Sequence, residues 1–277
     1  METQDNSIIL HKFGQDITGV EIYAICDLHI GDPKTDEKMI QNFVSFIAAK
    51  PNKYWVYNGD NLNNAIKSSV SNVYNEKYPP GDQKYRFIEL VRPIADKCLA
   101  FVPGNHEARS AKEDDVHLVF DIAVVLVGEA RARELYRENE AFIKISLGQK
   151  IRGSCQNSKP ATYVGLIHHG AGGGSLPGSS LNRIYAYTQT IEGLDFSMTG
   201  HVHKGILSGL VGKRVIDSRN NVVTTSSYAI AISPSWADFG GYSARNMMRP
   251  AANGIGWISL AGDRKCVGYH AMQASYI

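Results

Sequence analysis

The stretch Phe101-Val102-Pro103-Gly104-Asn105-His106-Glu107 decides how the rest of this sequence is interpreted. Its apolar run stops at Pro-Gly, and an amide and an imidazole side chain follow directly. This pattern predicts a buried strand with polar side chains at its C-terminal end. The same arrangement recurs in four further stretches, Ile25–His29, Val56–Asn61, Leu166–Gly170 and Met198–His203. Because open α/β sheets bind ligands at the carboxyl ends of their strands, we expect the five ends to form one shared site.

Length and composition are those of an ordinary globular protein. The chain has 277 residues, of which 43% are hydrophobic and 20% charged, which is enough to bury a sizeable core. A formal net charge of +2 is too small to imply nucleic-acid binding through bulk electrostatics.

No segment has the character of a membrane span or a signal peptide. The longest apolar run, Ile122–Val127, is far shorter than the ~20 residues that a spanning helix needs, and Met1–Leu10 is polar and acidic. We therefore expect a cytoplasmic protein without a membrane partner. The four cysteines are far apart and form no CxxC or CxH pair, which predicts neither a disulfide framework nor a zinc ribbon: Cys26, Cys98, Cys155 and Cys266.

The first third of the chain predicts a βαβ unit. The apolar run Ile22–Cys26 predicts a central strand, and Asp32–Thr35 offers turn residues and a candidate helix N-cap. Spacing of i, i+3, i+4 and i+7 then predicts an amphipathic helix that ends before Pro51, with Ile40, Phe43, Val44 and Ile47 on its apolar face. Tyr54–Tyr57 is the next strand.

The middle of the chain predicts a long loop, two helices and a strand. Asn61–Gln83 is polar and lacks a period, so we expect a loop that serves as a substrate wall. Tyr85–Lys97 predicts a helix that Pro93 kinks or begins, and Cys98–Val102 predicts the third strand. A second helix is predicted beyond the Gly104 motif. The acidic residues Glu113–Asp115 suit its N-terminus, and one face of it carries Val116, Val119, Phe120, Ala123 and Val127.

The sequence beyond Glu140 is rich in strand patterns. Apolar and polar residues alternate around Ile143, which predicts a strand there. Two further strands are predicted by the apolar stretches Thr162–Ile167 and Asp195–Thr199. Residues 204–277 are expected to complete a second sheet, through Gly205–Val211, Val222–Ile232, Ile255–Leu260 and Lys265–His270. No repeat or linker is visible, so we expect a single α/β domain over residues 1–277, with two mixed sheets packed face to face and helices outside both.

The polar residues at the five strand ends predict a metal centre. They are Asp27, His29, Asp60, Asn105, His168 or His169, His201 and His203. Unpaired polar groups of this number in a core would carry large desolvation penalties, whereas metal ligation satisfies them. Imidazole, carboxylate and amide ligands together suit Mn²⁺, Fe²⁺ and Zn²⁺ better than Ca²⁺ or Mg²⁺. Seven ligands are more than one tetrahedral ion can bind, so we predict two ions that share a carboxylate.

Five motifs in this order resemble the calcineurin-like metallophosphoesterase superfamily: Asp27-x-His29, Gly59-Asp60, Gly104-Asn105-His106-Glu107, His169-Gly170 and Gly200-His201-x-His203. They lie within residues 27–203, and the ordered set is far more specific than any single motif. The resemblance implies a four-layer α/β-β/α sandwich and a dinuclear metal-dependent phosphoesterase, with Mn²⁺ as the expected metal and Fe²⁺ or Zn²⁺ as alternatives.

The resemblance also implies a role for each motif residue. One ion would be bound by Asp27, His29, Asp60 and His203, and the other by Asp60, Asn105, His169 and His201. Asp60 would be the bridge, and His106 would act beside the metals, near the leaving group.

Three positions are open or depart from the family pattern. His169 precedes a glycine, as the family's ligand commonly does, but a shift by one residue would make His168 the ligand. Many members carry an acidic residue three positions after the bridging aspartate, and this chain has Asn63 there. Glu107 either supports the site or is simply an acidic residue at a helix start.

Two classes of function follow. The first is a phosphoesterase, with a DNA-processing nuclease or nucleotide phosphodiesterase favoured, because a groove for nucleic acid could be lined by Lys67, Lys77, Lys84, Arg86, Tyr74, Tyr78 and Tyr85. The alternative for these residues is a solvated loop. Gly172–Gly174 either lets the backbone approach the centre or forms a flexible loop.

The second class is a protein-interaction scaffold that keeps the fold without turnover. The sequence does not predict the oligomeric state.

Overall fold

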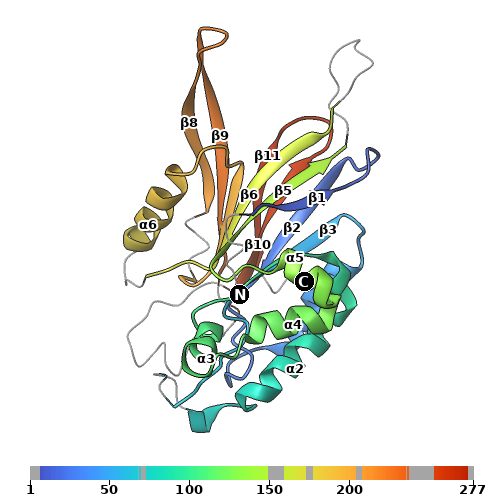
Figure 1. Ribbon diagram of the computed structural model, residues 1–277, viewed down its shortest axis with the longest axis vertical. Helices are drawn as coiled ribbons and strands as arrows, with labels where there is room; N and C mark the ends of the chain where they lie inside the picture. Colours follow the sequence, from blue (N-terminus) through green and yellow to red (C-terminus); the bar gives the residue numbers. More distant parts are fainter. Residues whose placement is uncertain are drawn as a thin grey trace.

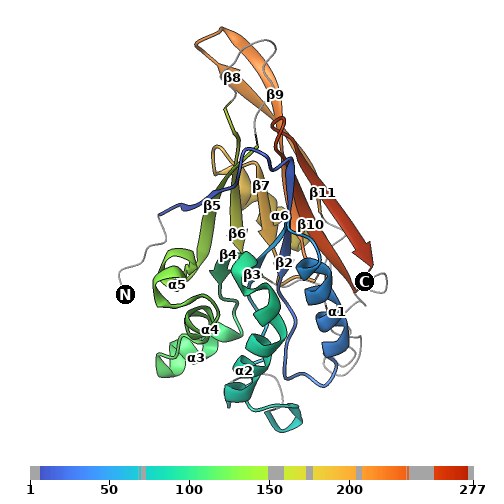
Figure 2. The same cartoon turned by 90° about the vertical axis from the view of Figure 1, so that its right-hand side faces the viewer.

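The computed structural model describes residues 7–67, 69, 73–148, 159–172, 177–203, 208–234, 236 and 253–273. Its centre is a pair of mixed β-sheets packed face to face, with helices on the outer faces (Figures 1 and 2). The predicted α/β sandwich is confirmed.

The first sheet has five strands in the order β11-β10-β2-β3-β4. Three of them are parallel and form the predicted βαβ core: β2 (Gly19–Ile25), β3 (Lys53–Asn58) and β4 (Cys98–Val102). These strands are almost continuously buried, as expected for strands covered on both faces. The antiparallel strands β10 (Gly254–Ala261) and β11 (Val267–Gln273) extend this sheet beyond β2.

The second sheet has six strands in the order β1-β5-β6-β7-β9-β8. They are β1 (Ile9–Lys12), β5 (Glu140–Leu147), β6 (Ala161–His168), β7 (Phe196–Thr199), β8 (Gly209–Asp217) and β9 (Val222–Ile232). The ends of β8 and β9 project from the sandwich as a two-stranded ribbon (Figures 1 and 2).

The expectation that residues 204–277 complete the second sheet is therefore half wrong. β8 and β9 join that sheet, but β10 pairs antiparallel with β2, where Trp257 lies opposite Tyr23 and stacks on its ring. An alternating pattern predicts that a segment is a strand, but the choice of sheet depends on contacts with residues more than 200 positions away, which the pattern does not encode.

Helices cover both outer faces. On the first sheet lie α1 (Glu37–Ala48), α2 (Pro80–Val91), α4 (Leu118–Val127) and α5 (Glu129–Leu135). On the second sheet, α6 (Pro177–Gln189) packs Ile184 against Tyr228 and Ile230 of β9. The apolar face of α1 buries Ile40, Phe43, Val44 and Ile47 as predicted, although the N-cap is Asp36, which accepts from the N–H of Met39, rather than a residue of 32–35.

Two helix predictions need correction. The helix predicted from Tyr85 begins earlier, at Pro80, as α2. Near Pro93, which cannot donate a backbone bond, it gives way to the 3-10 helix η3 (Arg92–Lys97), in agreement with the predicted kink. Glu113–Asp115 does not begin α4. It ends a separate helix, α3 (Glu107–Asp114), whose C-cap Asp115 is left-handed with φ of 56°. The predicted loop 61–83 contains a 3-10 turn, η2 (Val73–Asn75).

Among the described residues, no helix is long and apolar enough to cross a membrane. Cys26, Cys98 and Cys266 are free thiols, and Cys155 lies outside the described residues.

Candidate metal centre

The predicted site residues follow the carboxyl ends of five strands. Asp27 and His29 come after β2, Asp60 after β3, and Asn105 and His106 after β4, all in the first sheet. From the second sheet, β6 leads into His169, and β7 leads into His201 and His203. The site therefore lies where the same edges of both sheets meet, as the strand-end pattern predicts.

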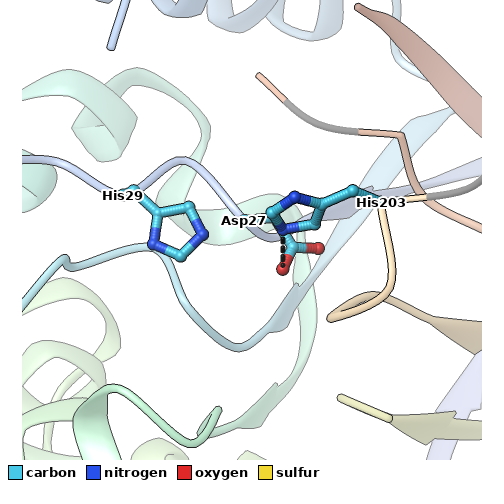
Figure 3. A group of neighbouring side chains, drawn as sticks. All are labelled: Asp27, His29 and His203. Atoms are coloured by element: carbon cyan, nitrogen blue, oxygen red, sulfur yellow. Dashed lines mark hydrogen bonds and ion pairs between the residues drawn. The ribbon is translucent and has the colours of Figure 1, made fainter. Parts of the chain in front are cut away.

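Six of the seven predicted ligands form two compact groups. Asp27, His29 and His203 form one, and Asp60, His169 and His201 form the other; in each group the potential ligand atoms lie within 4.8 Å of one another. In the first group the Nε2 atom of His203 is 3.1 Å from Oδ1 of Asp27, with His29 beside them (Figure 3).

The seventh predicted ligand, Asn105, has an exposed side chain and lies directly before His106. The N–H of His106 donates to Oδ1 of Asp60 at 2.8 Å, so the Asn105 loop runs beside the second group. Its role as a ligand stays a prediction.

The backbone at these positions is strained. Five non-glycine residues of the two groups have left-handed φ angles between 49° and 65°: Asp27, His29, Asp60, His201 and His203. L-residues pay of order 1 kcal/mol or more for this conformation, which persists where surrounding structure enforces it and is concentrated at functional sites. The strain therefore marks the same residues that the motifs select.

Backbone hydrogen bonds connect the strand-end loops and enforce this geometry. The N–H of His29 donates to the carbonyl of Asp60 at 3.1 Å, and the N–H of Asp27 donates to the carbonyl of Gly59 at 3.0 Å. Between the sheets, the N–H of His201 donates to Oδ1 of Asp27 at 3.0 Å. The two groups are thus parts of one rigid constellation.

The structure distinguishes between the two adjacent histidines. Nδ1 of His169 donates to the carbonyl of Asn58 at 2.8 Å, which leaves Nε2 facing Oδ2 of Asp60 at 3.1 Å. The neighbouring His168 points elsewhere, because its Nδ1 accepts from the N–H of Gly170 and its ring packs 5.7 Å from that of Tyr187 on α6. His169 therefore lies among the potential metal ligands, and His168 is not part of either group.

Glu107 supports the site. It lies in the first turn of α3, but the residue is only 2% exposed and its carboxylate faces the strand ends. It accepts hydrogen bonds from the N–H groups of Asp60, Gly104 and Leu62 and from the hydroxyl of Tyr57. Of the two interpretations that the sequence leaves open, the structure supports a direct contribution to the geometry around Asp60.

His106 lies beside the two groups. Its Nδ1 donates to the backbone carbonyl of Asn63 at 2.7 Å, and its Nε2 is 3.8 Å from Oδ2 of Asp60. Asn63, which replaces the family's acidic residue, thus contacts the imidazole through its main chain. Its side-chain amide donates to Glu76 at 2.6 Å, a residue that the motifs did not single out because Glu76 lies in the long loop.

The protonation equilibria of the site show strong charge pairing. Burial favours the neutral carboxyl of Asp60, but the imidazoles of His169, His106 and His29 outweigh it and hold its pKa below the ordinary value. Burial likewise opposes the charged form of His169, yet Asp60 prevails and raises the pKa of His169 to about 10. The pKa of Asp27 is also lowered, with His203 outweighing burial. Both carboxylates therefore attract a cation, and metal ions can displace the imidazole protons.

The residues fit a divalent metal. Among the described residues, Nδ1 of His29 is buried without a hydrogen-bond partner, which is costly unless another species supplies one. Burial, His106 and other nearby groups lower the pKa of His29 to about 3, so its ring is neutral and able to coordinate.

Comparison with known proteins agrees with this geometry. The family model described as calcineurin-like phosphoesterase matches residues 21–205, about two thirds of the chain. The chain belongs to the calcineurin-like phosphoesterase family. No curated protein matches it.

Two solved structures resemble this calcineurin-like phosphoesterase distantly. The calcineurin-like phosphoesterase YfkN from Bacillus subtilis is 14% identical with a TM-score of 0.43, and the alignment covers 93% of this chain and 91% of YfkN. GAP50, the anchor in the inner membrane complex of Plasmodium, is 12% identical with a TM-score of 0.47. This alignment covers 93% of this chain and 85% of GAP50.

The predicted nucleic-acid groove receives little support. The ammonium of Lys84 pairs with Asp121 at 2.9 Å, Arg86 pairs with Glu37 at 2.7 Å, and Lys77 donates to the carbonyl of Thr35 at 3.0 Å. Lys67, Tyr74 and Tyr85 remain exposed. Two of the four predicted basic side chains, Lys84 and Arg86, are thus paired with carboxylates within the protein. Of the predicted Gly172–Gly174 loop, residues 173 and 174 lie outside the described part.

Proposed function

We propose that this family member hydrolyses phosphoesters at a dinuclear centre bridged by Asp60. Asp27, His29, Asp60 and His203 would hold one ion, and Asp60, Asn105, His169 and His201 the other. The observation that carries this proposal is the pair of groups that the structure brings together, with the buried carboxylate of Asp60 between Nε2 of His169 and Nε2 of His106.

Two divalent ions would supply Lewis acidity towards the phosphoryl oxygens and would lower the pKa of the attacking water. The donor set of two carboxylates, four imidazoles and one amide favours Mn²⁺, with Fe²⁺ or Zn²⁺ as alternatives. Among the described residues, Cys26 is the thiol next to the site, and burial raises its pKa well above the usual value, so it is a poor nucleophile.

His106 has the geometry of a general acid. Because its Nδ1–H is committed to the carbonyl of Asn63, Nε2 is the atom that can hold a transferable proton, and it faces the centre next to Asp60. A proton delivered from Nε2 would neutralise the departing oxygen, which matters for a strongly basic alkoxide and little for a nitrophenolate.

The leaving group therefore gives the test of His106. We expect His106→Gln to keep its metal content and much of its rate on bis(p-nitrophenyl) phosphate, and to lose ~10²–10⁴-fold on an alkyl or nucleotide ester. Rates and metal content are measured in parallel, with His117→Gln as the matched control because His117 lies outside the site, before α4. Equal losses on both esters would exclude the acid role.

As the finer assignment, we propose phosphodiesters of nucleotides or nucleic acid as substrates. It is supported by the exposed aromatic rings of Tyr74 and Tyr85, on which bases can stack, and opposed by the internal pairing of Lys84 and Arg86. A panel of single- and double-stranded DNA, cyclic nucleotides and phosphomonoesters separates these classes. A preference for monoesters would overturn the assignment. The cytoplasmic location stays a prediction.

The scaffold alternative predicts metal binding without hydrolysis. Six potential ligands lie in two compact groups with His106 beside them, which supports hydrolysis over the scaffold. Purified protein that retains metal and hydrolyses no ester of the panel with added Mn²⁺ would favour the scaffold.

A further inference from the structure

The imidazole of His106 is connected to a carboxylate by way of Asn63. Nδ1 of His106 donates to the Asn63 carbonyl at 2.7 Å, and the side-chain amide of Asn63 donates to Oε1 of Glu76 at 2.6 Å. The N–H of Asn63 also donates to the carbonyl of Ile30 at 2.9 Å. Three hydrogen bonds therefore define how Asn63 presents its carbonyl to the histidine.

The second oxygen of Glu76 closes a ring of hydrogen bonds. Oε2 accepts from Nε2 of Gln83 at 2.9 Å, and Oε1 of Gln83 accepts from the N–H of Asn64 at 2.8 Å. The Asn64 side chain donates to the main-chain carbonyl of His106 at 2.7 Å. Both the imidazole and the backbone of His106 are thus connected to the same carboxylate, which is the only carboxylate among these hydrogen-bonded residues.

Glu76 is packed between the His29 loop and the His106 loop. The following residue, Lys77, donates its N–H to the carbonyl of Gly31 at 2.7 Å. The side-chain ends of Glu76 and Gln83 lie directly against Gly31, where an added Cβ would have to displace them. Glu76 itself is half-buried. Hydrogen bonds to a partly desolvated carboxylate are shorter and stronger than neutral ones, so Glu76 can hold this arrangement.

We propose that Glu76 is a positioning residue for His106 and acts through Asn63. The carboxylate fixes the Asn63 side chain, Asn63 holds the Nδ1–H of His106, and Nε2 is thereby aimed at the leaving oxygen. Arg109 lies 3.4 Å from the same carbonyl, and Glu76 offsets its charge. This inference rests on the proposed acid role of His106. It adds a residue outside the five motifs, in a loop where sequence spacing gives no signal.

The test compares Glu76→Ala with Asn63→Ala and with the double variant. Asn63→Ala keeps the backbone carbonyl that receives Nδ1–H but removes the amide that contacts Glu76. Asp82→Ala is the matched control, because it removes an exposed carboxylate from the first turn of α2, close in sequence to Glu76. Each protein is assayed on a nitrophenyl ester and on an alkyl ester of the same phosphoryl group, with metal content measured.

We expect Glu76→Ala and Asn63→Ala each to keep their metals, to lose less than about 2-fold on the nitrophenyl ester and to lose ~10–100-fold on the alkyl ester. The double variant should lose no more than either single one, because both remove the same connection. Glu76→Gln, which keeps one acceptor oxygen, should recover part of the rate. Losses that multiply in the double variant, equal losses on the two esters, or loss of metal would each overturn the proposal.

A spectroscopic measurement separates this proposal from the proposed function. In ¹⁵N NMR spectra of the protein loaded with Zn²⁺, which is diamagnetic, the ring of His106 should show a protonated Nδ1 in the wild type and mixed tautomers in Glu76→Ala. An unchanged tautomer in Glu76→Ala would exclude positioning by Glu76, whatever the enzymatic rates are. If the tautomer changes but His106→Gln shows no leaving-group dependence, then the acid role fails and Glu76 is left as a structural residue.

Discussion

Asp60 is held by the protein from three directions. Its N–H donates to Glu107, its Oδ1 accepts from the N–H of His106, and its Oδ2 faces Nε2 of His169. Its backbone is left-handed, with φ of 51°. A side chain fixed this firmly can bridge two ions without losing conformational freedom when they bind, which is the advantage of a preorganised ligand.

Asp60→Asn should lower metal content and activity together. The amide keeps the shape of the carboxylate but removes the charge that offsets both ions, so we expect a loss of at least about 100-fold in rate. Metal analysis and rates on a nitrophenyl ester measure this, with Asp121→Asn at the surface as the control. A variant with two ions per chain and near-normal rates would contradict the bridging assignment.

The adjacent histidines give a second prediction. His169→Ala should lose one ion per chain, because it removes the Nε2 atom that faces Asp60, whereas His168→Ala should keep both. The comparison is made by metal analysis after equilibration with Mn²⁺. If His168→Ala loses the ion instead, then the ligand assignment moves by one residue.

Most of the site could be predicted at this scale, and the reason is chemical. Motif residues such as His201 and His203 are recognisable because strand ends and metal ligands have local signatures. The sequence left His168 and His169 as alternatives because the direction of a side chain after a strand depends on its partner, here the carbonyl of Asn58. Glu76 has no local signature at all, since its contacts come only from folding of the long loop.

At the scale of elements, the turn from β4 into α3 brings the centre together. Gly104 lies between them and packs directly on Asp60, where an added Cβ would collide with both the side chain and the backbone N–H of that residue. The turn can approach the bridging carboxylate only because this residue lacks a side chain.

Gly104→Ala should therefore displace Asp60 and reduce metal content and rate, by ~10-fold or more. Gly81→Ala in α2 is the control, because a Cβ there has nothing within 4 Å. We expect the control to keep full activity. Normal metal binding by Gly104→Ala would show that the turn can relax away from Asp60.

The limits of sequence-based prediction are also clear among the elements. The helical spacing of apolar residues in α1 and the apolar runs of β2 and β4 are patterns of neighbouring residues. These elements therefore lie where the sequence predicts them. The boundary between α3 and α4 is set by a single left-handed C-cap, Asp115, which an acidic run at a helix start conceals. The place of β10 beside β2 depends on tertiary pairing.

At the scale of the whole molecule, the two sheets are connected far from the metal ligands as well. His11 of β1, at the edge of the second sheet, places its Nε2 2.9 Å from the carbonyl of Leu99 in β4, at the edge of the first. The side chain is buried, so this hydrogen bond joins the two sheets inside the core.

Burial lowers the pKa of His11 from 6.5 to about 4, although the bond to Leu99 opposes the shift. Between these values the unfolded chain binds a proton that the folded chain does not. The stabilisation is complete above pH 6.5 and is lost as the pH falls towards 4. For this one group, linkage predicts a loss of about 2 kcal/mol in the free energy of unfolding between pH 7.5 and pH 5.

His11→Gln should remove this pH dependence. The glutamine amide can still donate to Leu99 but does not titrate, so the loss of stability between the two pH values should be smaller than in the wild type by about that 2 kcal/mol. Urea unfolding at both pH values measures the difference, and the titrating groups of the metal centre cancel because both proteins contain them. His117→Gln, which alters a histidine outside the core, should leave the wild-type pH dependence intact. Equal pH dependence in wild type and His11→Gln would mean that His11 takes up its proton without opening the contact between the sheets.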